Sequence, residues 1–277
     1  MVNADTINKV VEVIRTGYVD KDIAEKVSVE ILDYTNSLIG KSRMGMDDPS
    51  HFINDINAII NVYSHDMHFS LNLVSGGSSG ISRITPHYVS LSEIDSMREE
   101  SNRSSYINMF KTIKDPLVLD LRSCRGGDAN MVFFILCHFF PDGHHLFDLE
   151  SRAGVQKFTV GSTVTHYQTF NNITKFNGKI KVLTSQYTYS GGEIIAKILQ
   201  SHGRAKVYGS KTIGTVNATT KYRVDDVIIN LPFGKFIDAV SKKSFENVGV
   251  VPDYPVNSQE YITTMFSEVV ENIFNPY

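Results

Sequence analysis

A serine at the start of a predicted helix is the residue of this chain best placed for chemistry. Ser190 lies within Thr188–Glu193, after a short apolar run over 180–183 and before a helical pattern over 194–199. A serine at such a strand-to-helix corner exposes its hydroxyl beside the unpaired N–H groups of the first helical turn. That pairing can supply a nucleophile and an oxyanion-binding site together. Ser190 with Glu193 is equally a capping box, which closes a helix start with no chemistry.

A pair of glycines makes the second candidate. The loop Arg122–Gly127 follows an apolar strand pattern over 116–121 and precedes a helix that opens at Asp128. Gly126 and Gly127 let the backbone approach a ligand closely and turn an N–H toward it. The loop is either an oxyanion site or only a tight turn. It has neither the lysine of a phosphate-binding loop nor the outer glycines of a dinucleotide fingerprint.

Two histidines and a carboxylate gather in Ser64–His68. His68 could act as a general base near the acidic Asp66. His65 and His68 could instead hold a metal ion, although no third ligand lies nearby in the sequence. The segment could also be a polar junction with no role. His144 and His145 lie beside a turn and are expected to be solvated.

The elements that position these residues follow from hydrophobic spacing. Three amphipathic stretches over 7–14, 23–38 and 52–63 predict a small N-terminal helical bundle, residues 1–63. From residue 64 to residue 277, strands and helices alternate, which predicts an α/β core with a partly parallel sheet. The expected strands are 68–73, 116–121, 180–184, 205–208, 226–231 and 235–240, and the expected helices are one from Asp128, one over 191–202 and one from Ser258. Gly76–Gly80 is expected to be a loop, and residues 147–170 are expected to form an excursion of antiparallel strands from the core.

Composition excludes several classes of protein. The 277 residues carry a formal net charge of −3 and no basic stripe, so nucleic acid is not an expected partner. No apolar run is long enough for a membrane span. The first residues show no secretion signal, which predicts a cytoplasmic protein unless a leader has been removed. The two cysteines, Cys124 and Cys137, form no disulfide framework; Cys137 is expected to be a buried apolar residue, and Cys124 could be a thiol of lowered pKa.

Several motifs in order resemble the tail-specific, or C-terminal-processing, serine peptidases. Residues 116–127 resemble that family's "vLDLRxNxGG" signature, and 182–193 look like its "TxSxxE" nucleophile motif. Residues 209–214 match "GxxTxG", and 249–253 match "GVxPD". Asp66–Leu71 resembles the "DxHxxl" element of the histidine-bearing branch, which includes the tricorn core protease, the nisin-resistance protein and retinoid-binding modules.

The resemblance implies a crotonase-like ββα core and a serine acyl-enzyme mechanism. Ser190 matches the nucleophile and His68 the general base. The N–H of Gly191 matches one oxyanion donor, and Gly126 or Gly127 the other. A serine hydroxyl needs such a base, because it is a weak nucleophile by itself. The family implies a polypeptide substrate, and no cofactor or metal is expected.

This chain departs from the family pattern in several places. Thr215 stands where the PDZ-bearing branch has a catalytic lysine, so a Ser–Lys dyad is not expected. Met67 precedes His68 where tricorn-like members have a serine. Glu246 is the best-placed late carboxylate to orient the histidine. Cys124 stands where asparagine is usual.

Three hypotheses compete at this point. The first is a serine endopeptidase with Ser190 and His68. The second is a non-catalytic module that binds a peptide or apolar ligand on the same fold, since a fold does not fix a function. The third is a metal-assisted hydrolase that uses His65 and His68.

Overall fold

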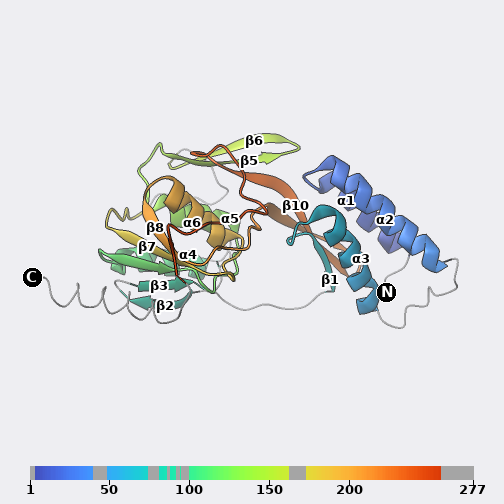
Figure 1. Ribbon diagram of the computed structural model, residues 1–277, viewed down its shortest axis with the longest axis horizontal. Helices are drawn as coiled ribbons and strands as arrows, with labels where there is room; N and C mark the ends of the chain where they lie inside the picture. The colour runs from blue at the N-terminus through green and yellow to red at the C-terminus, as the bar shows by residue number, and fades with distance from the viewer. Residues whose placement is uncertain are drawn as a thin grey trace, which may run out of the picture. The chain divides into compact units, whose positions relative to one another are not determined.

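The computed structural model describes residues 4–39, 49–73, 81–85, 88–91, 94, 100–161 and 173–256 (Figure 1). The chain divides into two compact units. The first unit comprises Met1–Ser78, Leu149–Gln156 and Asn217–Phe236, and the second comprises Ser79–Asp148, Lys157–Val216 and Ile237–Tyr277. None of the described helices combines the length and the apolarity needed to cross a membrane.

Three helices open the first unit, as the apolar spacing predicts. They are α1 (Ala4–Gly17), α2 (Lys21–Ile39) and α3 (Pro49–Ser64). The side chain of Asp20 caps α2, because its Oδ1 accepts hydrogen bonds from the N–H groups of Asp22 and Ile23 at 3.0 and 3.1 Å. The N-terminal helices of the predicted fold are therefore present.

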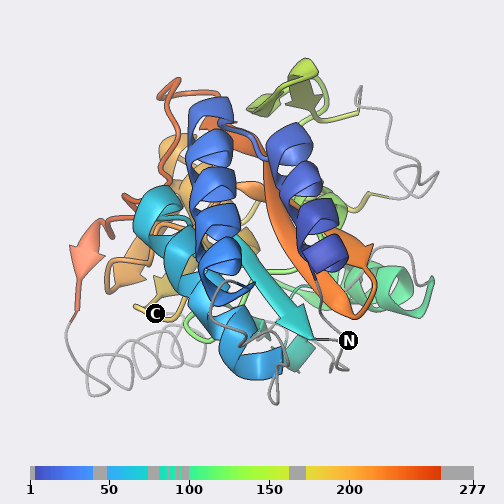
Figure 2. The same cartoon turned by 90° about the vertical axis from the view of Figure 1, so that its right-hand side faces the viewer.

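The strands of the first unit lie against these helices. β10 (Val227–Asp238) pairs antiparallel with β1 (Ser70–Leu73) and β9 (Ala218–Val224). Figure 2 shows α1, α2 and α3 packed over β1 and β10. Helices and strands share one apolar cluster, whose fully buried members include Val10, Ile14, Val27, Ile31, Ile56, Ile60, Leu71, Val227, Ile229 and Leu231. Removal of this apolar surface from water stabilises the unit.

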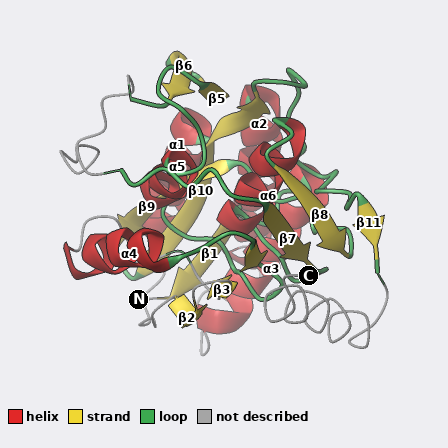
Figure 3. Ribbon diagram, turned by 90° about the vertical axis from the view of Figure 1, so that its left-hand side faces the viewer, coloured by secondary structure: helices red, strands yellow, loops and turns green. Residues whose placement is uncertain are grey.

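A six-stranded sheet organises the second unit. Its order is β11-β8-β7-β4-β3-β2, and all pairings are parallel except that of β2 with β3. The strands are β2 (Ile81–Thr85), β3 (Tyr88–Leu91), β4 (Leu117–Asp120), β7 (Ile180–Thr184), β8 (Ala205–Gly209) and β11 (Tyr254–Pro255). Figure 3 shows β11 beside β8 at one edge. Every residue of β4 is buried, as is typical of a parallel strand covered on both faces.

The described residues of the second unit also form three helices. They are α4 (Glu100–Thr112), α5 (Ala129–Cys137) and α6 (Gly191–Ser201). Asp128 caps α5, where its Oδ1 accepts from the N–H groups of Asn130 and Met131. The predicted strand–helix–strand unit is confirmed, since α6 connects β7 to the parallel β8. The α/β fold class is confirmed with it.

The remaining strands differ in part from the sequence prediction. β5 (His145–Ser151) and β6 (Gly154–Thr159) extend the sheet of β1 in the order β1-β10-β5-β6. The two strands predicted over 226–231 and 235–240 form the single strand β10, because a register shift between Pro232 and Gly234 absorbs the interruption. β9 was not predicted, because its mostly polar sequence does not alternate between apolar and polar residues.

Some predictions lie outside the described residues. These are the Gly76–Gly80 loop, the second half of the 147–170 excursion and the helix from Ser258. The unit that holds the N-terminal helices extends past residue 63 and takes in two later segments. A domain division into residues 1–63 and 64–277 stays a prediction.

Candidate functional site

Ser190 occupies a strained corner between β7 and α6. Its backbone angles are φ 51° and ψ −118°, a region that residues with side chains seldom adopt. Such strain costs about 1–3 kcal/mol and persists only where the surrounding structure enforces it. A capping serine needs no such conformation, because N-cap residues ordinarily lie in the β region, as Asp128 does. The strained serine corner is typical of a nucleophile held on a sharp strand-to-helix turn.

Gly126 lies directly against this corner. A Cβ added to Gly126 would fall 2.5 Å from Ser190 Cβ and 2.9 Å from the backbone nitrogen of Gly191. Gly126 also has a φ of +80°, which favours glycine. Both the close approach and the backbone angle therefore require glycine here. The structure brings Ser190, Gly191 and Gly126 together, as the sequence predicts.

Two backbone N–H groups near Ser190 have no backbone acceptor among the described residues. Within the described part of the chain, neither Gly191 nor Gly127 donates its N–H to a backbone carbonyl. Ile94 fixes the glycine pair from the other side, since its N–H donates to Gly126 O at 2.6 Å and its carbonyl accepts from Asp128 N at 3.1 Å. Ile94 was missed in the sequence, because a single apolar residue between strand and helix patterns carries no signal.

Hydrogen bonds join the serine loop to the glycine loop. The N–H of Tyr189 donates to Cys124 O at 2.9 Å, and the hydroxyl of Ser185 donates to Arg122 O at 2.6 Å. The hydroxyl of Thr188 donates to Leu121 O at 2.8 Å. These bonds connect segments more than 60 residues apart in sequence. They hold the nucleophile candidate and the oxyanion candidates in one fixed arrangement.

A buried carboxylate stands behind the serine. Glu193 accepts hydrogen bonds from Ser190 N at 3.0 Å, Thr212 Oγ1 at 2.5 Å, Gly214 N at 2.6 Å and Thr215 N at 2.9 Å. Burial raises the pKa of Glu193, and these four bonds oppose that rise. Thr212 also accepts from Val250 N at 2.7 Å. The "TxSxxE", "GxxTxG" and "GVxPD" segments therefore meet in one network around Glu193.

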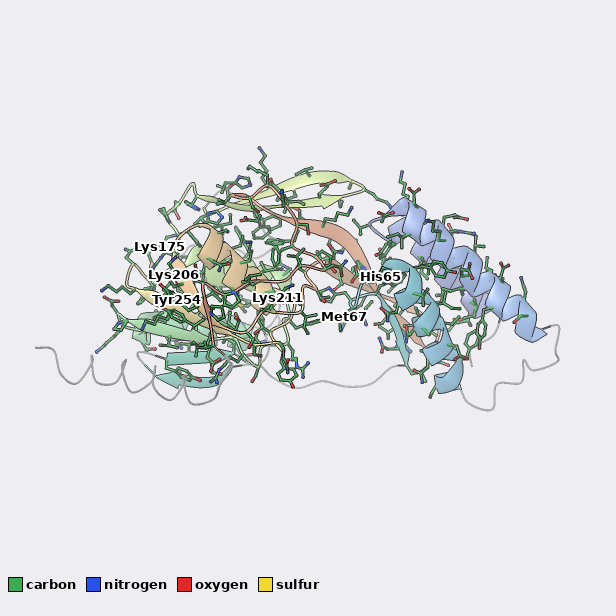
Figure 4. The ribbon with its side chains drawn as sticks, viewed as in Figure 1. His65, Met67, Lys175, Lys206, Lys211 and Tyr254 are labelled. Atoms are coloured by element: carbon green, nitrogen blue, oxygen red, sulfur yellow. The ribbon has the colours of Figure 1, made fainter. Side chains whose placement is uncertain are left out.

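Glu246 lies close to the same segment. Its Oε2 accepts a hydrogen bond from Val216 N at 2.6 Å. Glu246 is half-buried, and the residue that it binds, Val216, directly follows Thr215. Lys211 is exposed (Figure 4), and the backbone N–H of Thr215 donates to Glu193.

His68 lies in the first unit, on the turn between α3 and β1. Its backbone N–H donates to Asp66 Oδ1 at 2.9 Å, and the other carboxylate oxygen of Asp66 accepts from Asn217 Nδ2 at 3.0 Å. Asp66 therefore holds the backbone of the histidine loop. Burial raises the pKa of Asp66, against the hydrogen bonds from Asn217 and His68. Burial also lowers the pKa of His68 to about 4, so the imidazole is neutral at physiological pH.

An amide holds the strand that follows the histidine. Asn57 Oδ1 accepts from Leu71 N at 2.7 Å, and Asn57 Nδ2 donates to Leu71 O at 2.9 Å. This pair of bonds imitates a neighbouring strand and closes the edge of β1 at that residue. The roles of Asn57 and Asn217 carried no signal in the sequence, because each depends on a partner in a distant segment. Ser190 belongs to the second unit and His68 to the first.

The remaining candidates take structural positions. Cys137 is buried as predicted, and burial raises the pKa of its thiol to about 12. Cys124 is fully buried beneath Gly192, where its Sγ would lie 3.0 Å from an added Cβ. His65 is exposed at the end of α3 (Figure 4). Among the described residues, no three His, Cys, Asp or Glu side chains converge to hold a metal ion.

The prediction for His144 and His145 was wrong. Both are half-buried rather than solvated. His144 Nε2 lies 2.8 Å from His202 Nδ1, and His145 Nε2 lies 2.7 Å from Asp148 Oδ1. The turn is followed at once by β5, so His144 packs against His202 at the end of α6, while His145 contacts Asp148 within β5. Burial lowers the pKa of His144, and His202 and His145 lower it further.

The family comparison covers most of this architecture. Residues 87–256 match the model of peptidase family S41, which is more than half of the chain. The chain belongs to this peptidase family, and the match supports a hydrolase of the serine protease class. Ser190, Gly126, Glu193 and Glu246 all fall inside the matched residues.

Solved structures confirm the fold. A lipoprotein from Streptococcus agalactiae is 15% identical with a TM-score of 0.65, over 96% of this chain and 97% of that chain. A photosystem II D1 C-terminal processing protease is 12% identical with a TM-score of 0.59, over 92% of this chain and 94% of that chain. The tricorn protease is 12% identical with a TM-score of 0.62, over 97% of this chain but only 36% of its own length. At such low identity these likenesses show the fold alone.

Proposed function

We propose that this protein is a serine endopeptidase that cleaves a polypeptide through an acyl-enzyme. Ser190 Oγ attacks the scissile carbonyl carbon while a ring nitrogen of His68 takes the hydroxyl proton. The N–H of Gly191 and that of Gly126 or Gly127 stabilise the negative oxygen of the tetrahedral intermediate. The imidazolium returns the proton to the leaving amine, and a water molecule then hydrolyses the ester by the same steps.

The observation that carries this proposal is the strained backbone of Ser190. The corner places a hydroxyl beside two N–H groups that the described backbone does not use, with Gly126 in contact. A purely structural helix cap gains nothing from that strain. A non-catalytic module is not favoured, because it would have no reason to retain the strained serine together with the paired glycines.

The neutral state of His68 supports its role as a base. An imidazole whose pKa is lowered by burial is neutral at neutral pH, and a ring nitrogen can then accept the serine proton. Asp66 holds the histidine loop through the backbone N–H of His68. Glu246 is the candidate carboxylate that orients this histidine. Its role in the site remains part of the proposal.

A fluorophosphonate probe tests the nucleophile. We expect the wild-type protein to be labelled at Ser190, as mapped by mass spectrometry, and Ser190→Ala to abolish both labelling and the cleavage of denatured casein. Ser201→Ala is the matched control, because it removes a hydroxyl at the opposite end of the same helix, where it donates to Asp238. A folded wild-type protein that is never labelled and cleaves nothing would overturn the proposal.

A pair of histidine variants tests the base. His68→Ala should reduce the labelling rate at least about 100-fold, within the range of general-base contributions. His65→Ala, three residues earlier and exposed, should leave it unchanged. Equal losses in the two variants, together with inhibition by a chelator, would favour the metal-assisted hydrolase instead. The cytoplasmic location predicted from the sequence stays a prediction, which fractionation of the producing cells tests.

A further inference from the structure

An arginine and a tyrosine stand at the rim of the Ser190 corner. Arg125 is exposed and directly precedes Gly126, and Tyr187 is 55% exposed and lies three residues before Ser190. The guanidinium carbon of Arg125 lies 6.0 Å from the centre of the Tyr187 ring. That distance is the outer limit of a cation–π contact, which orients a guanidinium over an aromatic face. The glycine loop and the serine loop thus each contribute one side chain to the same rim.

The two arginines of the glycine loop have opposite environments. Arg122 forms a bidentate pair with Asp120, through Nε at 2.9 Å and Nη2 at 2.6 Å, and is half-buried. Arg125 has no ion pair with any residue in the part of the chain that the structure describes. Arg122 is satisfied within the fold, whereas the donors of Arg125 remain available.

The position of Arg125 is fixed on both sides. Its neighbour Cys124 is buried and accepts a hydrogen bond from Tyr189 N at 2.9 Å, and its neighbour Gly126 touches Ser190. On the facing loop, the N–H of Tyr187 donates to Ser185 Oγ at 2.9 Å. The backbone of Arg125 is therefore held in place beside Ser190, and the Tyr187 ring is the contact that orients its exposed guanidinium.

We infer that Arg125, oriented by Tyr187, binds a carboxylate of the substrate beside the scissile bond. The inference rests on the proposed function and narrows its substrate class to peptides that present a carboxylate near the cleaved bond. A guanidinium matches a carboxylate with two parallel hydrogen bonds. The carboxylate comes either from an Asp or Glu side chain or from the C-terminus of the polypeptide. Arg125 and Tyr187 set specificity and take no part in the chemistry.

Matched peptides test this inference. The bond that the wild-type enzyme cuts best in denatured casein is mapped by mass spectrometry, and peptides of that sequence are made with Asp or Asn at each flanking position. A second arm compares a free C-terminal carboxylate with a C-terminal amide. We expect kcat/KM to favour the carboxylate in one of the arms by at least about tenfold, since charged hydrogen bonds are the strong ones. The arm that shows the preference identifies the source of the carboxylate.

Variants then test whether Arg125 and Tyr187 cause the preference for a substrate carboxylate. Arg125→Gln should bring the carboxylate-to-amide ratio to within about twofold of one, and Arg125→Lys should keep part of it, because a lysine retains the charge without the fork. Tyr187→Leu should lower the ratio by a smaller factor. Lys179→Gln is the charge-matched control, since Lys179 is exposed and precedes β7 at the end away from Ser190. It should leave the ratio unchanged.

The failures of the two proposals are distinguishable. A wild-type enzyme that cleaves the peptides but shows no carboxylate preference, or whose preference survives Arg125→Gln, overturns the role of Arg125 and leaves the peptidase intact. If casein yields no cleavage, the readout is the labelling rate with peptidyl phosphonates that carry an acid or an amide beside the phosphonate. No labelling with any probe overturns the proposed function, and the role of Arg125 with it.

Discussion

Two buried carboxylates, one in each unit, hold the two candidate catalytic loops in different ways. Glu193 fixes the serine corner, and three of its four donors are backbone N–H groups, from Ser190, Gly214 and Thr215. Asp66 fixes the histidine loop through two backbone N–H groups, those of His68 and Phe69, and through the side chains of Asn217 and Tyr18. A backbone N–H cannot turn away without moving the chain, whereas a side-chain amide can rotate. Three of the four donors to Glu193 belong to the backbone, against two of the four donors to Asp66, so the serine side is the more rigidly held of the two.

The difference extends to the glycines. The serine corner is enclosed by Gly126, where even one methyl group would collide with Ser190. The histidine loop from His65 to Phe69 contains no glycine, and His65 takes a φ of 50° while exposed. Enclosure suits a nucleophile that must face fixed oxyanion donors. A base needs only to reach the proton, so a looser support is sufficient.

The largest effect should come from a methyl group at the serine corner. Gly126→Ala places its Cβ 2.5 Å from Ser190 Cβ at a φ of +80°. We expect casein cleavage and probe labelling to fall at least about 100-fold, as when an oxyanion donor is displaced. Gly143→Ala is the control, because Gly143 has a similar φ of +83° but nothing within 4 Å of its added Cβ. It should cost about 1 kcal/mol of stability with full activity.

A Gly126→Ala variant with activity within twofold of wild type would contradict the enclosure of Ser190. Equal losses in both alanine variants would attribute the effect to the backbone angle alone. Urea unfolding of each variant separates a loss of activity from a loss of fold.

The next largest effect is a difference in stability between variants of the two buried carboxylates, Glu193 and Asp66. Glu193→Gln replaces one acceptor oxygen by an NH₂ group, which then faces fixed donors that cannot turn away. We expect a loss of about 2–4 kcal/mol in the free energy of unfolding, since buried donors are left unpaired. Asp66→Asn should cost about 1 kcal/mol, because the amide of Asn217 can turn over and offer its oxygen. Urea unfolding at pH 7 measures both.

The rate of Ser190 labelling gives a second readout for these variants. It should fall more than about tenfold in Glu193→Gln, because the serine N–H loses its acceptor, and less in Asp66→Asn. If the two variants lose equal stability and equal rate, the proposed difference in rigidity is wrong.

The smallest expected effect is a pH dependence of the free energy of unfolding that is caused by His68. Its pKa in the folded protein is about 4, against about 6.5 when unfolded. Because the unfolded chain binds the proton first, the stability contributed by neutral His68 is complete above pH 6.5 and declines as the pH falls toward 4. We expect a loss of about 2 kcal/mol between pH 7 and pH 5 that is absent from His68→Gln.

The same pKa places the acid limb of kcat/KM near pH 4 in the free enzyme, rather than near 6.5. An acid limb at 6.5, with equal pH dependence of unfolding in wild type and His68→Gln, would show that His68 is solvated. That result would contradict the burial of His68, although an imidazole of ordinary pKa is still mostly neutral at pH 7 and could still act as the base.

The sequence determined the local features of this protein. Most of the described helices, the corner after β7 and the glycine pair after β4 were predicted, because periodic apolar residues and paired glycines restrict the backbone over a few residues at a time. Ser190 and Gly126 could be named for the same reason. The helix α4 was not predicted. The local pattern gave a wrong prediction at β10. Two strands were predicted there, but the structure has one continuous strand, with a register shift between Pro232 and Gly234.

Only the tertiary structure decided which distant groups meet. The contact of Asn217 with Asp66 joins residues 151 positions apart, and Gly126 reaches Ser190 through the pairing of β4 with β7. The rim of Arg125 and Tyr187 arises in the same way. Such contacts depend on how whole elements pack, and packing is a property of the complete core that no short stretch of sequence contains.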